Sequence, residues 1–130
     1  MSFIEFKNVC KKYPGSDKNT VDNFSLEIEE KEFIAFVGPS GCGKSTTLRM
    51  IAGFEEITGG ELYIDGKKVN EMAPRDRGIS MVFQNYALYP HMTVEKNIGY
   101  GLKNMKMPAD QIKKKVDWAI DILGLEEYRY

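Results

Sequence analysis

Hydrophobic and polar residues alternate loosely along the first thirty positions, and this pattern predicts strands that expose one face. Segment 3–13 carries the β-forming residues Phe3, Ile4, Phe6 and Val9. A Pro-Gly-Ser turn at 14–16 follows, and residues 21–28 then alternate again, with an apolar face made of Phe24, Leu26 and Ile28. We therefore expect an antiparallel, half-exposed pair of strands.

Three further segments have the character of strands. Residues 33–37 (FIAFV) are apolar throughout, which favours a strand buried on both faces, as in a parallel sheet. Residues 61–64 form a short expected strand that ends in a turn at Asp65 and Gly66. Residues 79–83 (ISMVF) are another expected strand.

Helical spacing of apolar residues is found in three places. Residues 44–52 follow a glycine-rich turn, and Gly53 is a suitable stop. Thr93 can cap a helix over about 94–105, although Gly99 and Gly101 weaken this prediction. The last helix starts at about Pro108 and has one apolar face, made of Ile112, Val116, Ala119, Ile120 and Leu123.

Composition narrows the class of protein. The 130 residues are 42% hydrophobic and 28% charged, which fits one soluble, folded domain. A formal net charge of −1 argues against a nucleic-acid binder. No apolar run approaches the roughly 20 residues of a membrane span, and residues 1–9 do not resemble a signal peptide. Cys10 and Cys42 lie far apart, which disfavours zinc and fits a reduced cytosolic setting.

Residues 38–46 (GPSGCGKST) fit a phosphate-binding loop between a strand and a helix. Glycines let successive backbone N–H groups point at phosphate oxygens, and the helix N-terminus favours the same anion. Lys44 can bridge the outer phosphates, and the Ser45 hydroxyl can ligate Mg²⁺. The pattern predicts that ATP binds through Gly38, Pro39, Ser40, Gly41, Cys42, Gly43, Lys44, Ser45 and Thr46. A glycine-rich turn that binds nothing is the alternative.

Two long stretches, FVGPSGCGKSTTLRMIAG and MVFQNYALYPHMTVEKNI, resemble the ATP-binding subunits of ABC transporters. The likeness is to carbohydrate importers of the maltose, multiple-sugar and glycerol-phosphate type, and it runs from Phe3 to about Tyr128. It implies an α/β fold, the N-terminal portion of a P-loop NTPase. This portion combines an antiparallel β part, a partial parallel core and a helical appendage. Residues 1–90 would form the β-rich and P-loop core, and residues 91–130 the start of the helical subdomain.

The resemblance also assigns roles to single residues. Tyr13 matches the aromatic residue that stacks on adenine, and Val21 matches a minor apolar contact to the base. The alternative for Tyr13 is a strand-end tyrosine whose hydroxyl faces water. Gln84 matches the glutamine that reaches Mg²⁺ and the attacking water, so Lys44 and Gln84 are the expected catalytic contributors. A single glutamine after a strand does not by itself indicate this role; the flanking residues MVFQNYALYPHMT support it.

Partners follow from the same likeness. Loop 84–93 would dock on membrane-spanning permease subunits, through an aromatic stretch made of Tyr86, Leu88, Tyr89 and Pro90. The alternative is that this stretch packs onto the helical tail, and both can hold. A second ATPase subunit would complete the parent protein, which would lie on the inner face of the cell membrane as a peripheral subunit.

Several motifs of the resembled family are missing from the 130 residues. These are an LSGGQ signature, an apolar strand that ends in Asp-Glu, and a later switch histidine; His91 is expected to be a loop residue. We therefore expect a truncated part of an importer subunit that couples ATP binding and hydrolysis to solute uptake. A nucleotide- or partner-binding fragment without turnover is the alternative. Another kind of P-loop domain is a third hypothesis, which the stretch 81–93 disfavours.

Overall fold

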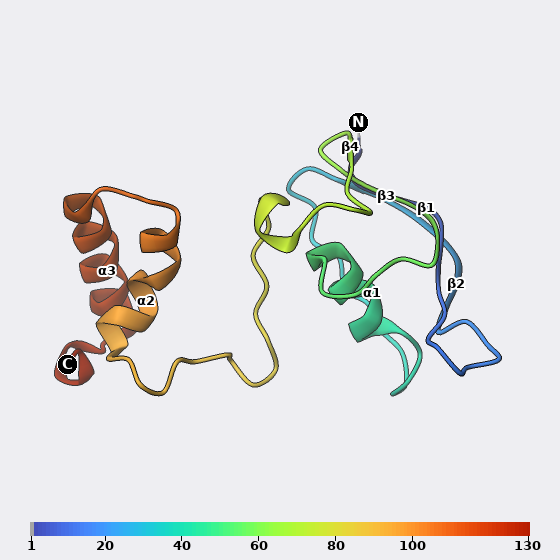
Figure 1. The fold of residues 1–130 in the computed structure, drawn as a ribbon. Helices are drawn as coiled ribbons and strands as arrows, with labels where there is room; N and C mark the ends of the chain where they lie inside the picture. The colour runs from blue at the N-terminus through green and yellow to red at the C-terminus, as the bar shows by residue number, and fades with distance from the viewer. Residues whose placement is uncertain (1) are drawn as a thin grey trace. The chain divides into compact units, whose positions relative to one another are not determined.

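The computed structural model describes residues 2–130, which divide into two compact units between Met81 and Val82 (Figure 1). The first unit contains one antiparallel sheet of four strands in the order β2-β1-β3-β4. Its strands are β1 (Ser2–Lys11), β2 (Val21–Glu29), β3 (Gly59–Ile64) and β4 (Lys67–Lys68). The predicted antiparallel pair and the strand at 61–64 are thereby confirmed.

Ile4 and Phe6 alternate along β1, and a register shift between Phe6 and Val9 then lets Val9 join them on the face that α1 (Lys44–Ala52) covers. Met50 of α1 is fully buried, and it belongs to the same cluster as the strand residues Phe6, Val9, Val21, Leu62 and Ile64. Phe24 of β2 meets Phe6 edge-on, with 5.0 Å between the ring centroids. The sheet thus provides the platform on which α1 and the loop before it rest.

Helix α1 has the predicted bounds, and its C-terminal end is held by a distant arginine. Gly53 ends the helix in the left-handed conformation, with φ of +84°. The buried Arg77 follows a short 3₁₀ turn, η1 (Pro74–Asp76), and donates to the carbonyl oxygens of Met50 and Ile51 at 2.8 and 3.1 Å. These bonds supply donors to carbonyl groups in the last turn, of which the Met50 oxygen also accepts from the Gly53 N–H at 3.3 Å.

Two predicted strands are wrong. Residues 33–37 and 79–83 form neither strand nor helix, and Phe33, Val37 and Val82 expose 93%, 92% and 85% of their surface. Only Phe36 of the first run is tied to the sheet by a ring contact, at 6.2 Å from Phe24. Neither run belongs to the sheet that the structure describes in residues 2–130, and a strand needs a hydrogen-bonding neighbour whatever its hydrophobicity.

The second unit is a helical hairpin of α2 (Val94–Asn104) and α3 (Ala109–Leu123), followed by the 3₁₀ turn η2 (Glu126–Tyr128) (Figure 1). The Thr93 hydroxyl caps α2 by accepting from the Lys96 N–H, as predicted. Gly99 is buried where the helices meet, and a Cβ there would lie 3.3 Å from Val116 Cγ2. The glycine that weakened the prediction of α2 is therefore the residue that lets α3 approach.

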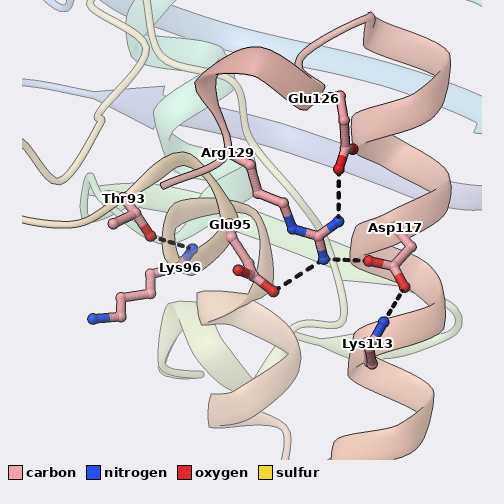
Figure 2. A network of polar contacts seen from close by, with 7 residues as sticks. All are labelled: Thr93, Glu95, Lys96, Lys113, Asp117, Glu126 and Arg129. Carbon is pink, nitrogen blue, oxygen red and sulfur yellow. Dashed lines mark hydrogen bonds and ion pairs between the residues drawn. The ribbon is translucent and has the colours of Figure 1, made fainter.

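Arg129 links η2 to both helices (Figure 2). Its guanidinium donates to Glu95 at 3.2 Å, to Asp117, and to Glu126 at 3.5 Å. Lys113 donates to the second oxygen of Asp117 at 2.7 Å. Hydrogen bonds from Lys113 and Arg129 hold the pKa of Asp117 below its usual range, so this carboxylate stays charged.

None of the helices in the described part of the chain is long and apolar enough to cross a membrane.

Candidate phosphate-binding site

The loop before α1 adopts a conformation that only glycine accepts easily. Gly43 has φ of +92°, and a Cβ on it would lie 2.9 Å from the carbonyl oxygen of Thr20 and 3.1 Å from Val21 Cγ2. Gly41 also has a positive φ, of +80°, but faces open space. The sequence motif thus folds into a tight turn pressed against the start of β2.

The N-terminus of α1 has no side-chain cap and no acidic residue in its first turn. The backbone N–H and the hydroxyl of Thr47 both donate to the Gly43 carbonyl oxygen, at 2.9 and 2.8 Å. The N–H groups of the preceding helical residues have no intrahelical acceptors, and the helix dipole adds partial positive charge. This end of α1 is therefore suited to an anion.

A cavity of about 310 Å³ opens at this end of the helix, lined by Thr20, Ser40, Gly41, Gly43, Lys44, Ser45 and Thr46. Lys44 is the only charged residue in this lining, and no carboxylate contributes to it. Hydroxyls, backbone groups and one ammonium form a donor set that fits phosphate.

The ammonium of Lys44 is folded back onto the loop. It donates to the carbonyl oxygens of Gly38 and Pro39, the latter at 2.9 Å, and lies 3.7 Å from Cys42 Sγ. These contacts join the start of the loop to the first residue of α1. They also hold the positive charge inside the loop.

Tyr13 lies beside the phosphate loop, held by its hydroxyl. That group donates to Glu55 Oε2 at 3.1 Å and lies 3.2 Å from Thr46 Oγ1. Lys11 Nζ lies 2.9 Å from Glu55 Oε1 and 5.0 Å from the centroid of the Tyr13 ring. The alternative of a strand-end tyrosine with its hydroxyl in water is therefore wrong, because two side chains contact that hydroxyl; stacking of the ring on adenine stays a prediction.

The hydrogen bond from Lys11 holds the pKa of Glu55 below its usual range, and the bond from Tyr13 adds to this effect. Sequence reasoning missed both Lys11 and Glu55. No local pattern signals them, since Tyr13 and Glu55 are 42 positions apart.

Val21 is buried at the base of the loop, next to Gly43. Its predicted contact with a nucleotide base stays a prediction.

The residues present fit Mg²⁺ only together with a phosphate ligand. Among residues 2–130 no three His, Cys, Asp or Glu side chains cluster into a metal site. Ser45 would supply a single hydroxyl oxygen. Mg²⁺ commonly binds through one or two protein groups plus substrate phosphates, so this sparse set is adequate when a nucleotide is bound.

Gln84 belongs to the second unit and is exposed in a turn. The Tyr86 N–H closes this turn on the Phe83 carbonyl oxygen at 2.9 Å, and Tyr86 and Ala87 both have positive φ. Tyr86 and Leu88 expose 76% and 71% of their surface. Tyr89, at 39%, and Pro90 are exposed as well, so the predicted exposure of this stretch is confirmed.

Tyr89 also packs on α2 of its own unit. Its ring lies 4.6 Å from that of Tyr100 on α2. Asn97, which sequence reasoning missed, accepts from the Tyr89 N–H at 2.9 Å and donates to the carbonyl oxygens of Tyr89, Met92 and Thr93. The loop is therefore fixed to α2 at one end while its tip is exposed. Packing onto the helical tail, one of the two alternatives for this stretch, therefore holds for Tyr89, and docking on a permease subunit stays a prediction.

Three curated relatives resemble nearly all of this chain. The oligosaccharides import ATP-binding protein MsmX of Bacillus subtilis is 61% identical over 98% of the chain and 35% of its own length. The multiple sugar-binding transport ATP-binding protein MsmK of Streptococcus mutans is 58% identical over 96% and 33%. The sn-glycerol-3-phosphate import ATP-binding protein UgpC of Bartonella quintana is 49% identical over 98% and 36%. The chain thus spans about a third of the length of the relatives it matches.

A solved structure shares the fold. The dimeric ATP-binding cassette MJ0796, determined in a post-hydrolysis state with ADP and Pi, superposes with a TM-score of 0.82 at 31% identity. The match covers 97% of this chain and 60% of that one, and it confirms the predicted α/β P-loop class. Residues 21–130 also match the sequence profile of the ABC transporter family. On this match, which spans most of its residues, the chain belongs to the ABC transporter family.

Proposed function

We propose that this chain binds ATP, with the phosphates held by loop 38–46 and the N-terminus of α1. The observation that carries the proposal is the glycine turn at Gly43, which leaves an uncapped helix end beside Lys44 in a cavity without carboxylates. That the related cassette MJ0796 is described with ADP and Pi bound supports the assignment.

In this proposal each part of the site has one task. The Lys44 ammonium leaves the carbonyl oxygens of Gly38 and Pro39 and bridges the outer phosphates. Ser45 and Gln84 would hold Mg²⁺, which would supply positive charge to the phosphates. Val21 contacts the base, and the ring of Tyr13 stacks on it. Lys44 and Gln84 are then the catalytic contributors.

We further propose that the parent protein is the ATP-binding subunit of an ABC importer, in which ATP binding and hydrolysis drive carbohydrate uptake. The names of the three relatives, each an import or transport ATP-binding protein, support this step. The dimeric MJ0796 structure supports a second ATPase subunit. The assignment of residues 1–90 to the core and 91–130 to the helical subdomain belongs to the same proposal.

Loop 84–93 is the proposed contact with membrane-spanning permease subunits, which would place the parent protein on the inner face of the cell membrane. The exposed Tyr86 and Leu88 supply apolar surface at the loop tip. The base of the loop is fixed by Asn97 and by the contact between Tyr89 and Tyr100. The loop therefore loses little conformational freedom when its tip docks on a partner.

Calorimetric titration of the 130-residue chain with Mg-ATP tests the central proposal. We expect saturable binding that Lys44→Ala weakens by about 10- to 100-fold, the range for a lost hydrogen bond to a charged group. Lys67→Ala removes an exposed lysine of β4 and should leave the affinity unchanged. Equal affinity in wild type and Lys44→Ala, or no binding at all, would overturn the proposal for this chain. Phosphate release in the same samples separates turnover from binding alone.

A further inference from the structure

The carboxylate of Glu55, which lies outside loop 38–46, bridges Lys11 at the end of β1 and Tyr13 just after that strand. Glu55 uses one oxygen for Lys11 Nζ, at 2.9 Å, and the other for the hydroxyl of Tyr13, at 3.1 Å. The side chains of Lys11 and Glu55 are only 7% and 20% exposed. Such a pair is far less screened by solvent than a surface ion pair, and it holds its geometry more firmly.

The same group of side chains fixes the Tyr13 ring in three ways. Glu55 and Thr46 hold its hydroxyl, and the Lys11 ammonium lies 5.0 Å from its centroid. A cation at this distance is attracted to the aromatic face. The ring is therefore restrained at its tip and over one face.

Thr46 connects this group to the phosphate site. It is in the first turn of α1 and lines the cavity of about 310 Å³, while its hydroxyl lies 3.2 Å from that of Tyr13. The position of the ring is thus tied to the helix that opens at the phosphate loop. Lys11 also offsets the negative charge of Glu55, which would otherwise repel phosphates near Thr46.

We propose that Lys11 and Glu55 are positioning residues, which hold the Tyr13 ring ready to stack on the base of a nucleotide bound at loop 38–46. This inference rests on the proposed function. A ring that is already fixed before binding loses little side-chain freedom when it stacks on the base, so the free-energy cost of binding is smaller. Loosening it should weaken binding of a nucleotide by about two- to tenfold, and should not affect a ligand without a base.

The test compares Mg-ATP with Mg-tripolyphosphate, which has the phosphates but no base, by titration of the 130-residue chain. Glu55→Gln, Lys11→Met and Tyr13→Phe should each weaken Mg-ATP about two- to tenfold and leave Mg-tripolyphosphate unchanged. Glu56→Gln is the matched control, because this neighbouring carboxylate is exposed. Tyr13→Phe removes one oxygen atom and keeps the ring, so it carries the test if the buried Lys11→Met variant does not fold.

The outcomes separate the inference from the function beneath it. Equal weakening of both ligands would show that the group merely supports the phosphate loop, and unchanged Mg-ATP affinity would show no role; either result overturns the inference alone. Two results would overturn the proposed function and the inference with it. One is that the wild-type chain binds neither ligand. The other is that the Lys44→Ala variant binds both ligands as tightly as wild type does.

Discussion

Arg77 Nη1 donates a hydrogen bond of 2.8 Å to the carbonyl oxygen of Met50, in the last turn of α1. The arginine is 7% exposed, and it also fills the space beside Gly53, where a Cβ would lie 2.8 Å from Nε. One side chain thus closes the end of α1 that lies opposite the phosphate loop.

Arg77→Met should destabilise the first unit by about 1–3 kcal/mol, because the carbonyl oxygens of Met50 and Ile51 at the end of α1 lose the guanidinium as a donor. The measurement is urea unfolding followed by circular dichroism. Arg75→Met serves as the control, since the side chain of Arg75 is 88% exposed. A Met variant as stable as wild type would mean that water replaces the guanidinium at no cost.

Gly43→Ala should abolish Mg-ATP binding. Its left-handed backbone costs about 1–2 kcal/mol with a Cβ, and that Cβ would lie only 2.9 Å from the Thr20 carbonyl oxygen. Gly41→Ala meets the same backbone cost at φ of +80° but no neighbouring atom within 4 Å, so it should bind more weakly than wild type yet measurably. Titration of both variants tests this order; equal affinities would show that the close packing at Gly43 is unimportant.

Gly99→Leu should destabilise the helical hairpin by about 1–3 kcal/mol, because the side chain would be forced against Val116 and Ile112. Gly101→Leu has nothing within 4 Å and should instead stabilise α2 by about 0.5–1 kcal/mol through helix propensity. Thermal unfolding of the two variants gives the comparison. Similar effects from both substitutions would contradict the observed approach of α3 at Gly99.

Asp117→Asn should change how the stability of the hairpin depends on pH. The folded pKa of Asp117 lies below its ordinary value of 3.8, so its contribution is present above that value and is lost as pH falls through the folded pKa. Wild type should therefore exceed the variant in stability at neutral pH, and this advantage should shrink once the pH falls below 3.8. Thermal melts across this range provide the readout. Asp121→Asn, an exposed substitution on the same helix, should leave the profile unchanged.

Asn97→Ala should free the base of loop 84–93. The Tyr89 N–H loses its acceptor, and its hydrogen exchange should accelerate by about tenfold, the effect of one typical hydrogen bond. Exchange measured by NMR reports this amide directly. Asn104→Ala, at the exposed end of α2, should leave Tyr89 unaffected. Unchanged exchange in the Asn97 variant would mean that the ring contact with Tyr100 alone holds the loop.

Local signals predicted the regular elements well. Helix α1 has the bounds predicted from its apolar spacing and Gly53, and Thr93 caps α2 as expected. Caps and turns depend on a few neighbouring residues, so the sequence contains the whole cause. The Asp65–Gly66 turn follows the same rule, with φ of +49° and +71° that join β3 to β4.

Apolar runs were less informative. Residues 33–37 are continuously hydrophobic, yet Phe33 and Val37 are almost fully exposed and no strand forms. A hydrophobic segment lowers its free energy when it is buried, but hydrophobicity alone does not make it a strand. A strand requires hydrogen-bonding partners from elsewhere in the chain. Such long-range pairing cannot be read from the run itself.

The candidate site also combines features with local causes and features that depend on long-range contacts. The sequence alone determined the glycine-rich loop before α1, because its glycines, its lysine and the start of the helix lie within nine consecutive residues, 38–46; phosphate binding there is the proposal. Only the tertiary structure decided that Glu55 would reach Lys11 and Tyr13, or that Arg77 would close α1. These contacts join residues that are dozens of positions apart, and they exist because the burial of one shared core brings together β1, α1 and the residues Met72 and Ile79 on either side of η1.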